Sequence, residues 1–413
     1  MKMVSTITLG LALALSSAAV VGVQPAVAAK KEKAPKAELT PAVREAVAAA
    51  QAAMAKEPKD VATATAQAAT ARAGATTPDD KFYAGSVSYD VGRNTNDKKL
   101  QGEALDLMLS SGKVPAESTG NFWKVRGVLA YESKDYPKAD QAFTQAIQAG
   151  DKGNDTYALA ADAKDRIGKP AEALALLQQA ISQAEAAGKP LPSEYYGRGI
   201  AIGYKAKLAP QVESISQSWL KAYPTQDNWR DSLIVYRDLN KIDADYELDL
   251  MRLMRTAKAM KGESDYYTYA EATYIKFPGE GKAVIDEGVA SGMLKLTAGS
   301  NIKAFSDQAN SRVGADKADL PGAAASAAKA GNGVAARATG DSYLGYGDYA
   351  KAAEMYRLAL QKGGVDANVV NTRLGMALAR AGQKEEARTV FSSITGPRQS
   401  LAKYWLIWLD QQA

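Results

Sequence analysis

The candidates for chemistry in this sequence are acidic, hydroxyl and lysine side chains, because the chain has no histidine and no cysteine among its 413 residues. Histidine is the usual acid or base near neutral pH, cysteine is the usual thiolate nucleophile, and both are common metal ligands. A disulfide framework is excluded as well. Catalysis would have to use carboxylates, lysine, tyrosine, serine or threonine, so the composition argues against an enzyme and against a bound metal or cofactor.

Four acids occupy alternate positions in DADYELD, residues 243–249, and superficially resemble a calcium-binding loop. Such a loop needs glycine at its sixth position and glutamate at its twelfth, but Leu248 and Met254 stand there. The segment therefore cannot turn and close around a cation in that way. We expect these acids to begin a helix whose later turns are basic, because that order complements the helix dipole.

Ser218 and Lys221 have the S-x-x-K spacing of penicillin-recognising enzymes, but the companion S-D-N and K-T-G motifs are absent from the sequence. The glycines of GYGDY and GNG lack both a phosphate-loop lysine and a preceding strand. Catalysis by two carboxylates that face each other across a groove, as in glycosidases, stays open, because a sequence does not show the distance between two carboxylates. We predict that the protein is not an enzyme.

Charge is mixed along the chain, with 51 basic and 46 acidic residues and a formal net charge of +5. Nucleic-acid binding usually requires a concentrated basic face, and none is visible. Apolar residues make up 46% and charged residues 23% of the chain, which are values typical of folded globular proteins. We expect a folded protein that does not bind nucleic acid.

Residues 1–29 have the features of a secretory signal peptide. A lysine precedes an apolar stretch over residues 7–23, and small residues follow before the next charges. Cleavage after Ala28 or Ala29 would leave no stable membrane span, and an uncleaved anchor is the alternative. We therefore expect a periplasmic or secreted protein, with a disordered basic tail over residues 30–39.

The elements that must position any site are helices. From Thr40 onward the apolar spacing is helical, and no segment shows the sustained two-residue alternation of a half-buried strand. We expect about nine to ten antiparallel helix pairs and a C-terminal capping helix. The predicted organisation is a helical repeat array over residues 40–295, a degenerate pair or hinge over residues 296–331, and further repeats with the capping helix over residues 332–413.

The capping helix is predicted from the last segment, PRQSLAKYWLIWLDQQA. Its apolar residues recur at helical spacing, with polar residues elsewhere around the helix. Such a helix would cover the exposed apolar face of the last repeat, as the end of a repeat array requires. A helix that binds a membrane or a partner is the alternative.

Small and aromatic residues recur with a fixed spacing in several segments. Gly340 and Tyr356 repeat the sixteen-residue interval between Gly127 and Phe143, and Ala139 lies four residues before that phenylalanine. These positions resemble the tetratricopeptide repeat, a helix–turn–helix unit of about 34 residues. The turn GDY, which begins at residue 347, also stands where that family places its turn between helices.

The resemblance implies an all-α fold, a right-handed α-solenoid of antiparallel helix hairpins. We expect the glycine to admit the alanine of the second helix, with the aromatic residue filling the space toward the next pair. Arg126 and Thr339 replace the leucine that usually precedes the glycine, so divergent helical hairpins are the alternative. A single hairpin cannot bury its apolar face, whereas a stack of hairpins can.

For function, the resemblance implies a scaffold or adaptor that binds a protein or peptide on the concave face of the superhelix. The alternative is an envelope glycan-binding or assembly module, because the segment SDYYTYAEATYIKF offers tyrosines that could stack on sugars. Against this alternative, two of its four tyrosines are expected to pack between repeats. The candidate partner-binding residues are Lys124, Tyr131, Tyr266, Tyr267, Asn371 and Arg373.

Overall fold

The computed structural model describes residues 37–412, and every regular element in that range is a helix. The predicted signal peptide and most of the basic tail lie outside the described residues. In chain order the helices are α1 (Pro41–Met54), α2 (Val61–Gly74), α3 (Pro78–Asn94), α4 (Lys98–Ser110), α5 (Ala116–Glu132), α6 (Tyr136–Gln148), α7 (Asn154–Arg166), α8 (Pro170–Ala186), α9 (Ser193–Lys205), α10 (Ala209–Ala222), α11 (Gln226–Leu239), α12 (Ala244–Thr256), α13 (Glu263–Thr273), α14 (Pro278–Ala290), α15 (Asn301–Lys329), α16 (Val334–Gly345), α17 (Tyr349–Lys362), α18 (Ala367–Arg380), α19 (Lys384–Ser392) and α20 (Gln399–Asp410).

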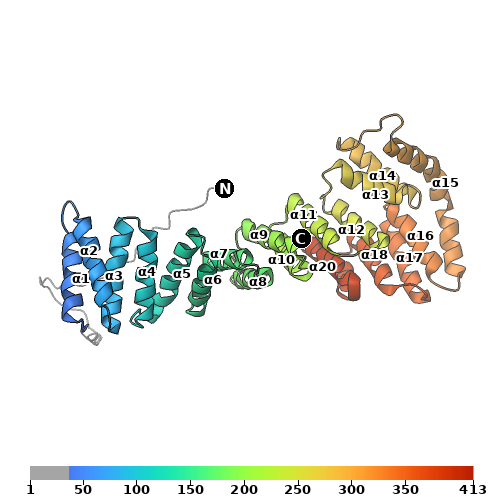
Figure 1. The fold of residues 1–413 in the computed structure, drawn as a ribbon. Coiled ribbons are helices and arrows are strands. Elements are labelled where there is room, and N and C mark those ends of the chain that lie inside the picture. Colours follow the sequence, from blue (N-terminus) through green and yellow to red (C-terminus); the bar gives the residue numbers. More distant parts are fainter. Residues whose placement is uncertain (1–36, 413) are drawn as a thin grey trace, which may run out of the picture.

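Within the described residues, successive helices pair into nine hairpins, from α1 with α2 to α18 with α19, while α15 and α20 stand outside the pairs (Figure 1). Local signals set the helix starts. Asp135 accepts a hydrogen bond from the backbone N–H of Lys138 at 3.2 Å and caps α6, and Asp348 caps α17 through Lys351 at 3.3 Å. The predicted α-solenoid of helix hairpins is thereby confirmed.

A glycine on the first helix of a hairpin lets an aromatic ring of the second helix lie against its backbone. A Cβ atom at Gly127 would stand 2.6 Å from the Phe143 ring, and one at Gly340 would stand 2.8 Å from the Tyr356 ring. We expected Ala139 in this place. The ring takes it because residues four apart share a helix face and long side chains lean toward the helix N-terminus.

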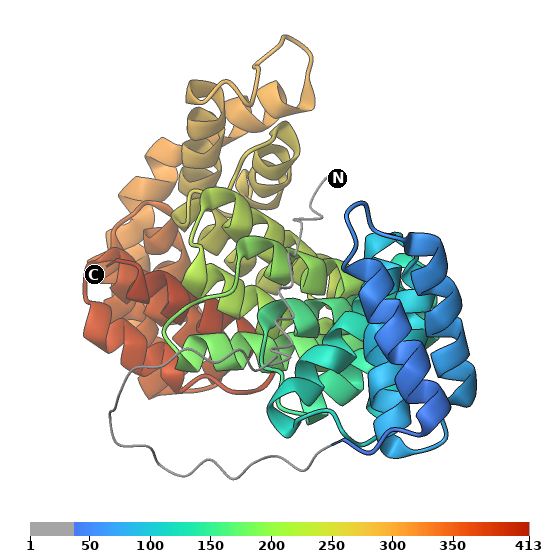
Figure 2. The ribbon, with the colours of Figure 1, turned by 90° about the vertical axis from the view of Figure 1, so that its left-hand side faces the viewer.

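Helices α1 to α10 form an extended stack, which Figures 1 and 2 show from two sides. Its apolar core is divided into clusters that neighbouring hairpins share, such as one between Val43 and Leu100 and another between Tyr157 and Trp219. Each hairpin thus buries its apolar face against the next hairpin, as expected of a linear repeat array.

Helices α11 to α20 close into a ring instead. One continuous buried cluster runs from Leu220 on α10 to the end of α20. On one side of α20, Trp405 stacks on Phe391 of α19 with ring centroids 5.5 Å apart. On the other side, Gln411 accepts a hydrogen bond from Trp229 Nε1 at 3.1 Å and donates one to the Leu220 carbonyl at 2.9 Å. The C-terminal helix covers the last hairpin and also joins it to the start of the ring.

Residues 296–331, where we expected a degenerate pair or a hinge, contain the single helix α15 of 29 residues. This helix connects α14 to α16 along the outside of the ring (Figure 1). Its second half is rich in alanine, which has the highest helix propensity, and Pro321 lies on its exposed side. Neither α15 nor another helix within residues 37–412 combines the length and the apolar character needed to cross a membrane.

Candidate binding site

Asp249 on α12 has no exposed surface and lies at the meeting point of three arginines. Its carboxylate accepts hydrogen bonds from Arg252 Nη1 at 2.8 Å, Arg373 Nε at 3.1 Å and Arg398 Nη1 at 2.6 Å. Burial alone would raise the pKa of Asp249, but the attraction of the guanidinium groups outweighs it and lowers this pKa to about 2. The carboxylate therefore stays charged at neutral pH and ties α12 to α18.

Two of these arginines carry the network to further carboxylates. Arg252 donates to Glu280 on α14 at 2.8 and 2.7 Å, and Arg373 Nη1 donates to Asp341 on α16 at 2.9 Å. Burial raises the pKa of Asp341 against the attraction of Arg373, whereas for Glu280 the attraction of Arg252 outweighs burial and lowers the pKa. The network thus connects four helices across the middle of the ring.

The acids of DADYELD take part in this structure. Asp243 caps α12 by accepting a hydrogen bond from the backbone N–H of Tyr246 at 2.8 Å, and Asp249 is the centre of the network. Asp245 lies 3.5 Å from Arg373 Nη2. These acids open a helix, as the sequence predicts, and no group of three or more acidic side chains within residues 37–412 is arranged to hold a metal ion.

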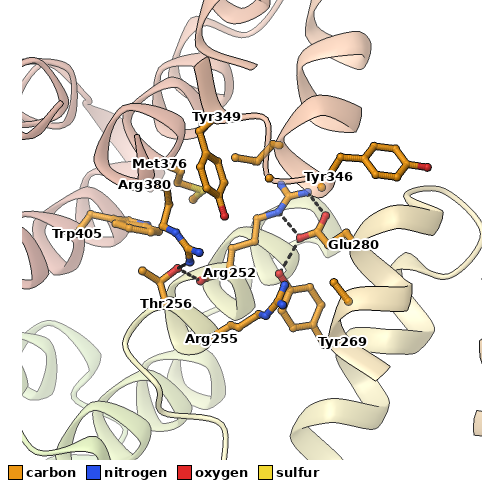
Figure 3. A pocket seen from close by; sticks show the side chains of 14 residues that line it. Arg252, Arg255, Thr256, Tyr269, Glu280, Tyr346, Tyr349, Met376, Arg380 and Trp405 are labelled. Atoms are coloured by element: carbon orange, nitrogen blue, oxygen red, sulfur yellow. Dashed lines mark hydrogen bonds and ion pairs between the residues drawn. The ribbon is translucent and has the colours of Figure 1, made fainter. Parts of the chain in front are cut away.

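A cavity of about 180 Å³ opens beside the network, and we call it the ring cavity. Side chains converge on it from α12, α13, α14, α16, α17, α18 and α20, as Figure 3 shows. The labelled lining residues are Arg252, Arg255, Thr256, Tyr269, Glu280, Tyr346, Tyr349, Met376, Arg380 and Trp405.

A wider depression of about 630 Å³ shares Tyr346, Gly347 and Tyr349 with the ring cavity and reaches Lys317 on α15. We call the two hollows together the ring cleft. The shared residues form the turn between α16 and α17. Gly347 has a φ of +76°, a backbone conformation that glycine adopts without strain, and Asp348 then caps α17. This turn holds both tyrosines at the junction of the two hollows.

Most charged groups that line the ring cleft are paired. Arg255 Nε donates to Glu287 at 2.7 Å, and Lys351 lies 3.4 Å from Asp348. The carboxylate of Glu280 is held by Arg252, as described above. The lining acids are therefore already occupied by cations of the chain itself.

Arg380 and Lys317 differ, because neither forms an ion pair with a carboxylate of the described residues. The Arg380 guanidinium lies over the Tyr349 ring, 5.1 Å from its centroid, and donates one hydrogen bond to Thr256 Oγ1 at 3.1 Å. One uncompensated cation thus stands at each of the two hollows. The ring cleft is suited to groups of negative charge.

The two candidate partner-binding residues of the N-terminal array, Lys124 and Tyr131, lie on α5. Lys124 and Tyr131 are both half-buried. The Tyr131 hydroxyl donates a hydrogen bond to Asp162 of α7, and Arg166 lies over the tyrosine ring at 5.9 Å from its centroid. Tyr131 therefore links the first helices of two neighbouring hairpins.

Asn371 and Arg373 lie on α18, but only Asn371 keeps some exposure. We expected Arg373 on an exposed face, and it is 1% exposed. Its guanidinium donates hydrogen bonds to Asp249 and Asp341 in the middle of the ring. Arg373 is therefore not accessible to a partner.

The tyrosine-rich segment falls on α13 and the residues after it. Tyr266 and Tyr269 are buried. Tyr267 and Tyr274 are half-buried and pack on Phe305 of α15, with ring centroids 5.6 and 4.2 Å apart. Two of the four tyrosines are thus packed between helices, and the other two cover a neighbouring helix. The segment does not present a row of free aromatic faces for a sugar.

The sequence did not point to the residues that the ring cleft brings together. Tyr346 and Tyr349 belong to GYGDY, which we considered only as a phosphate loop, and Arg380 and Trp405 carried no signal of a site. Their proximity to Thr256 depends on closure of the ring, since Arg380 and Thr256 are 124 residues apart. The positive-φ glycine turn was the single local signal available.

Comparison with solved structures finds 86 matching chains, among them those of the following three proteins. The chain is similar to Naa15 in the structure of Naa15/Naa10 bound to HypK-THB, with 14% identity and a TM-score of 0.31, covering 85% of this chain and 63% of that chain. The chain thus spans less than two thirds of Naa15. It is also similar to yeast Tom70, with 11% identity and a TM-score of 0.22, covering 78% and 87% of the two chains.

The third structure is the APC/C hetero-tetramer Cut9-Hcn1, with 12% identity, a TM-score of 0.20 and coverage of 91% of both chains. No family model matches the chain, and no curated protein matches it in sequence. The assignment as a tetratricopeptide-like solenoid follows from the hairpins, the turns and the glycine–aromatic contacts described above.

Proposed function

We propose that this chain is a non-catalytic scaffold that holds a segment of a partner protein in the ring cleft. The observation that carries the proposal is the cleft itself. Two joined hollows of about 180 and 630 Å³ share Tyr346 and Tyr349, and each holds one cation without a carboxylate partner in the described range. Tyrosine and arginine are enriched at protein–protein interfaces, so this lining is of the kind expected there.

Closure of the ring supports this role because it fixes the walls of the cleft before a partner arrives. The network around Asp249 and the contacts of Gln411 hold α12, α18 and α20 in place. A preformed site loses less conformational entropy on binding than a flexible site does.

The state of the lining acids also favours binding over acid or base catalysis. Glu280 and Asp348 are each occupied by a cation of the chain, so neither is placed as a free carboxylate. A glycosidase requires two carboxyl groups that flank the bond to be cleaved. Because these two carboxylates are paired with cations of the chain, the recognition surface that lines the cleft is stable at neutral pH.

We place the mature scaffold in the periplasm or outside the cell, on the strength of the leader pattern in residues 1–29. Cell fractionation of a C-terminally tagged chain tests this part of the proposal. The expected product is a shortened chain released by osmotic shock, and a full-length chain retained in the cytoplasm would contradict it.

Site-specific photo-cross-linking tests the scaffold function in the native organism. A photoreactive amino acid replaces Ala350, which is exposed and lines the wider hollow. The matched control is Ala338, an exposed alanine of the neighbouring helix α16 that does not line either hollow. We expect a discrete protein adduct from position 350 and none from position 338, and Lys317→Glu should weaken the adduct.

The partner is then identified by mass spectrometry of the adduct. Absence of an adduct at position 350, or equal adducts at both positions, would contradict binding in the ring cleft.

A further inference from the structure

The lining of the ring cleft is more basic than the chain as a whole. Five cationic and two acidic residues line the two hollows, whereas the whole chain has 51 basic and 46 acidic residues. The two acids are Glu280, which is held by Arg252, and Asp348, which caps α17 and lies 3.4 Å from Lys351. The lining therefore carries positive charge that its own acids do not balance.

Lys317 and Arg380 carry this charge on accessible side chains. Both residues are exposed, and neither forms an ion pair within the described residues. On a helix, an ionic partner usually stands three or four residues away. The helical neighbours at these distances are not acidic; they are Val313, Gly314, Leu320 and Pro321 around Lys317, and Met376 and Ala377 before Arg380. Both cations are thus open to an acid from outside the chain.

Contacts of the turn between α16 and α17 place each cation at its hollow. The Arg380 guanidinium lies over the Tyr349 ring, 5.1 Å from its centroid. The Tyr346 hydroxyl donates to Asp316 at 2.7 Å, and Asp316 directly precedes Lys317 on α15. Arg380 lines the ring cavity alone, and Lys317 lines the wider hollow alone. Two cations in different hollows match two acidic groups on one ligand better than one small anion.

The size and lining of the wider hollow fit a peptide. Its volume of about 630 Å³ lies within the roughly 300–1,000 Å³ of sites that enclose a small molecule, so it has room for a few residues. Pro321, Ala350 and Ala381 add exposed apolar surface to its wall. This surface suits a peptide backbone and the aliphatic stem of glutamate. A nucleic acid would require a concentrated basic face, whereas the cleft offers two free cations.

We propose that the ring cleft selects an acidic segment of the partner protein, with one side-chain carboxylate at Lys317 and a second at Arg380. The residues between these two acids lie across the turn, against Tyr346 and Tyr349. This inference rests on the scaffold function proposed above and names the chemistry of the partner.

Fluorescence anisotropy with the full mature chain tests this selection. The first probe is a short peptide of alternating alanine and glutamate, acetylated and amidated, so that side-chain carboxylates carry all of its charge. The second probe has glutamine in place of every glutamate. The third is a single-stranded oligothymidine, which offers phosphates instead of carboxylates. All three probes carry the same dye, which has no net charge.

We expect the acidic peptide to bind saturably and the neutral peptide not to bind. Lys317→Gln and Arg380→Gln should each weaken the affinity for the acidic peptide by roughly two- to fivefold, as expected for an exposed ion pair. The double variant should show the product of the two losses, because the cations contact separate acids. Added salt should weaken binding by the wild type more than binding by the double variant.

The matched control removes two positive charges outside the cleft. Lys329 is exposed on the same helix as Lys317, roughly 18 Å further along α15, and Arg357 forms an exposed pair with Glu386 at 2.6 Å. Neither residue lines either hollow. We expect the double variant Lys329→Gln, Arg357→Gln to bind the acidic peptide as the wild type does. Circular dichroism confirms that each variant is folded.

The inference is overturned if the acidic peptide does not bind, if the neutral peptide binds equally, or if the control pair weakens binding as much as the cleft pair does. Tighter binding of the oligothymidine that is lost in the cleft variants would assign the cleft to nucleic acid instead. An adduct from position 350 identifies a partner of any composition, so the scaffold function can hold while this inference fails.

Discussion

Asp249 is the residue at which the long-range contacts of the ring meet. It pairs with Arg373 and Arg398, which follow it by 124 and 149 residues. A buried ion pair adds little stability over a well-packed apolar core, but breaking one leaves uncompensated charges in the interior. At the scale of residues, we therefore expect the contact between the first and last hairpins of the ring to depend on Asp249.

Asp249→Asn should lower the free energy of unfolding by about 3–5 kcal/mol, because three buried arginines lose their shared counter-charge. Urea unfolding monitored by circular dichroism measures the loss. Asp286→Asn is the matched control, since Asp286 forms an exposed pair with Lys282 at 2.8 Å and should cost less than about 1 kcal/mol. Equal losses in both variants would contradict the central role of Asp249.

The pH dependence of unfolding gives an independent check. The pKa of Asp249 is about 2 in the folded chain, against an ordinary value of 3.8. Because the folded-state pKa is the lower one, the stabilisation is fully present above pH 3.8 and is lost as the pH falls toward 2. The wild type should lose about 2 kcal/mol more than Asp249→Asn across this window. Parallel curves for the two proteins would argue against the assignment.

At the scale of elements, three of the hairpins contain a close contact between a glycine of the first helix and an aromatic ring of the second helix. Gly127 and Phe143 form this contact in the array, and Gly340 and Tyr356 form it in the ring. The contact is close enough that one methyl group on the glycine would overlap the ring. The sixteen-residue spacing in the sequence is therefore a packing requirement of the hairpins that contain this contact.

Gly127→Ala should destabilise the chain by about 1–3 kcal/mol, because the added Cβ would stand 2.6 Å from the Phe143 ring. Gly314→Ala is the control. That glycine lies in α15 with no atom within 4 Å of a built Cβ, so alanine should stabilise the helix by about 0.5–1 kcal/mol. Thermal unfolding compares the two, and a stabilising Gly127→Ala would refute this packing.

Hairpins were predictable from the sequence because their signals are local. The cap at Asp348, the turn glycine Gly347 and the apolar spacing all lie within one repeat. The partner of the glycine was misassigned, since Ala139 and Phe143 lie on the same helix face and spacing alone does not show how far each side chain reaches. The second half of α15 is rich in alanine and has few large apolar residues, so the sequence showed no clear helical period there.

At the scale of the whole molecule, the chain changes from an open stack to a closed ring near α10. The ring depends on contacts such as that of Gln411 with Leu220, which are 191 residues apart. Local periodicity marks which residues of a helix are apolar, but it does not reveal which polar residues will face the inside of a ring. For this reason Arg373 was expected at the surface, and Arg380 was not identified.

The most direct test is whether the ring is closed in solution. The natural chain has no cysteine, so spin labels can be attached at Lys221→Cys on α10 and Asp410→Cys on α20, two exposed positions beside the contact of Leu220 with Gln411. Pulsed electron paramagnetic resonance then measures the distance between the labels. We predict one narrow distribution at short distance, and a broad distribution at long distance would contradict ring closure and the cleft that depends on it.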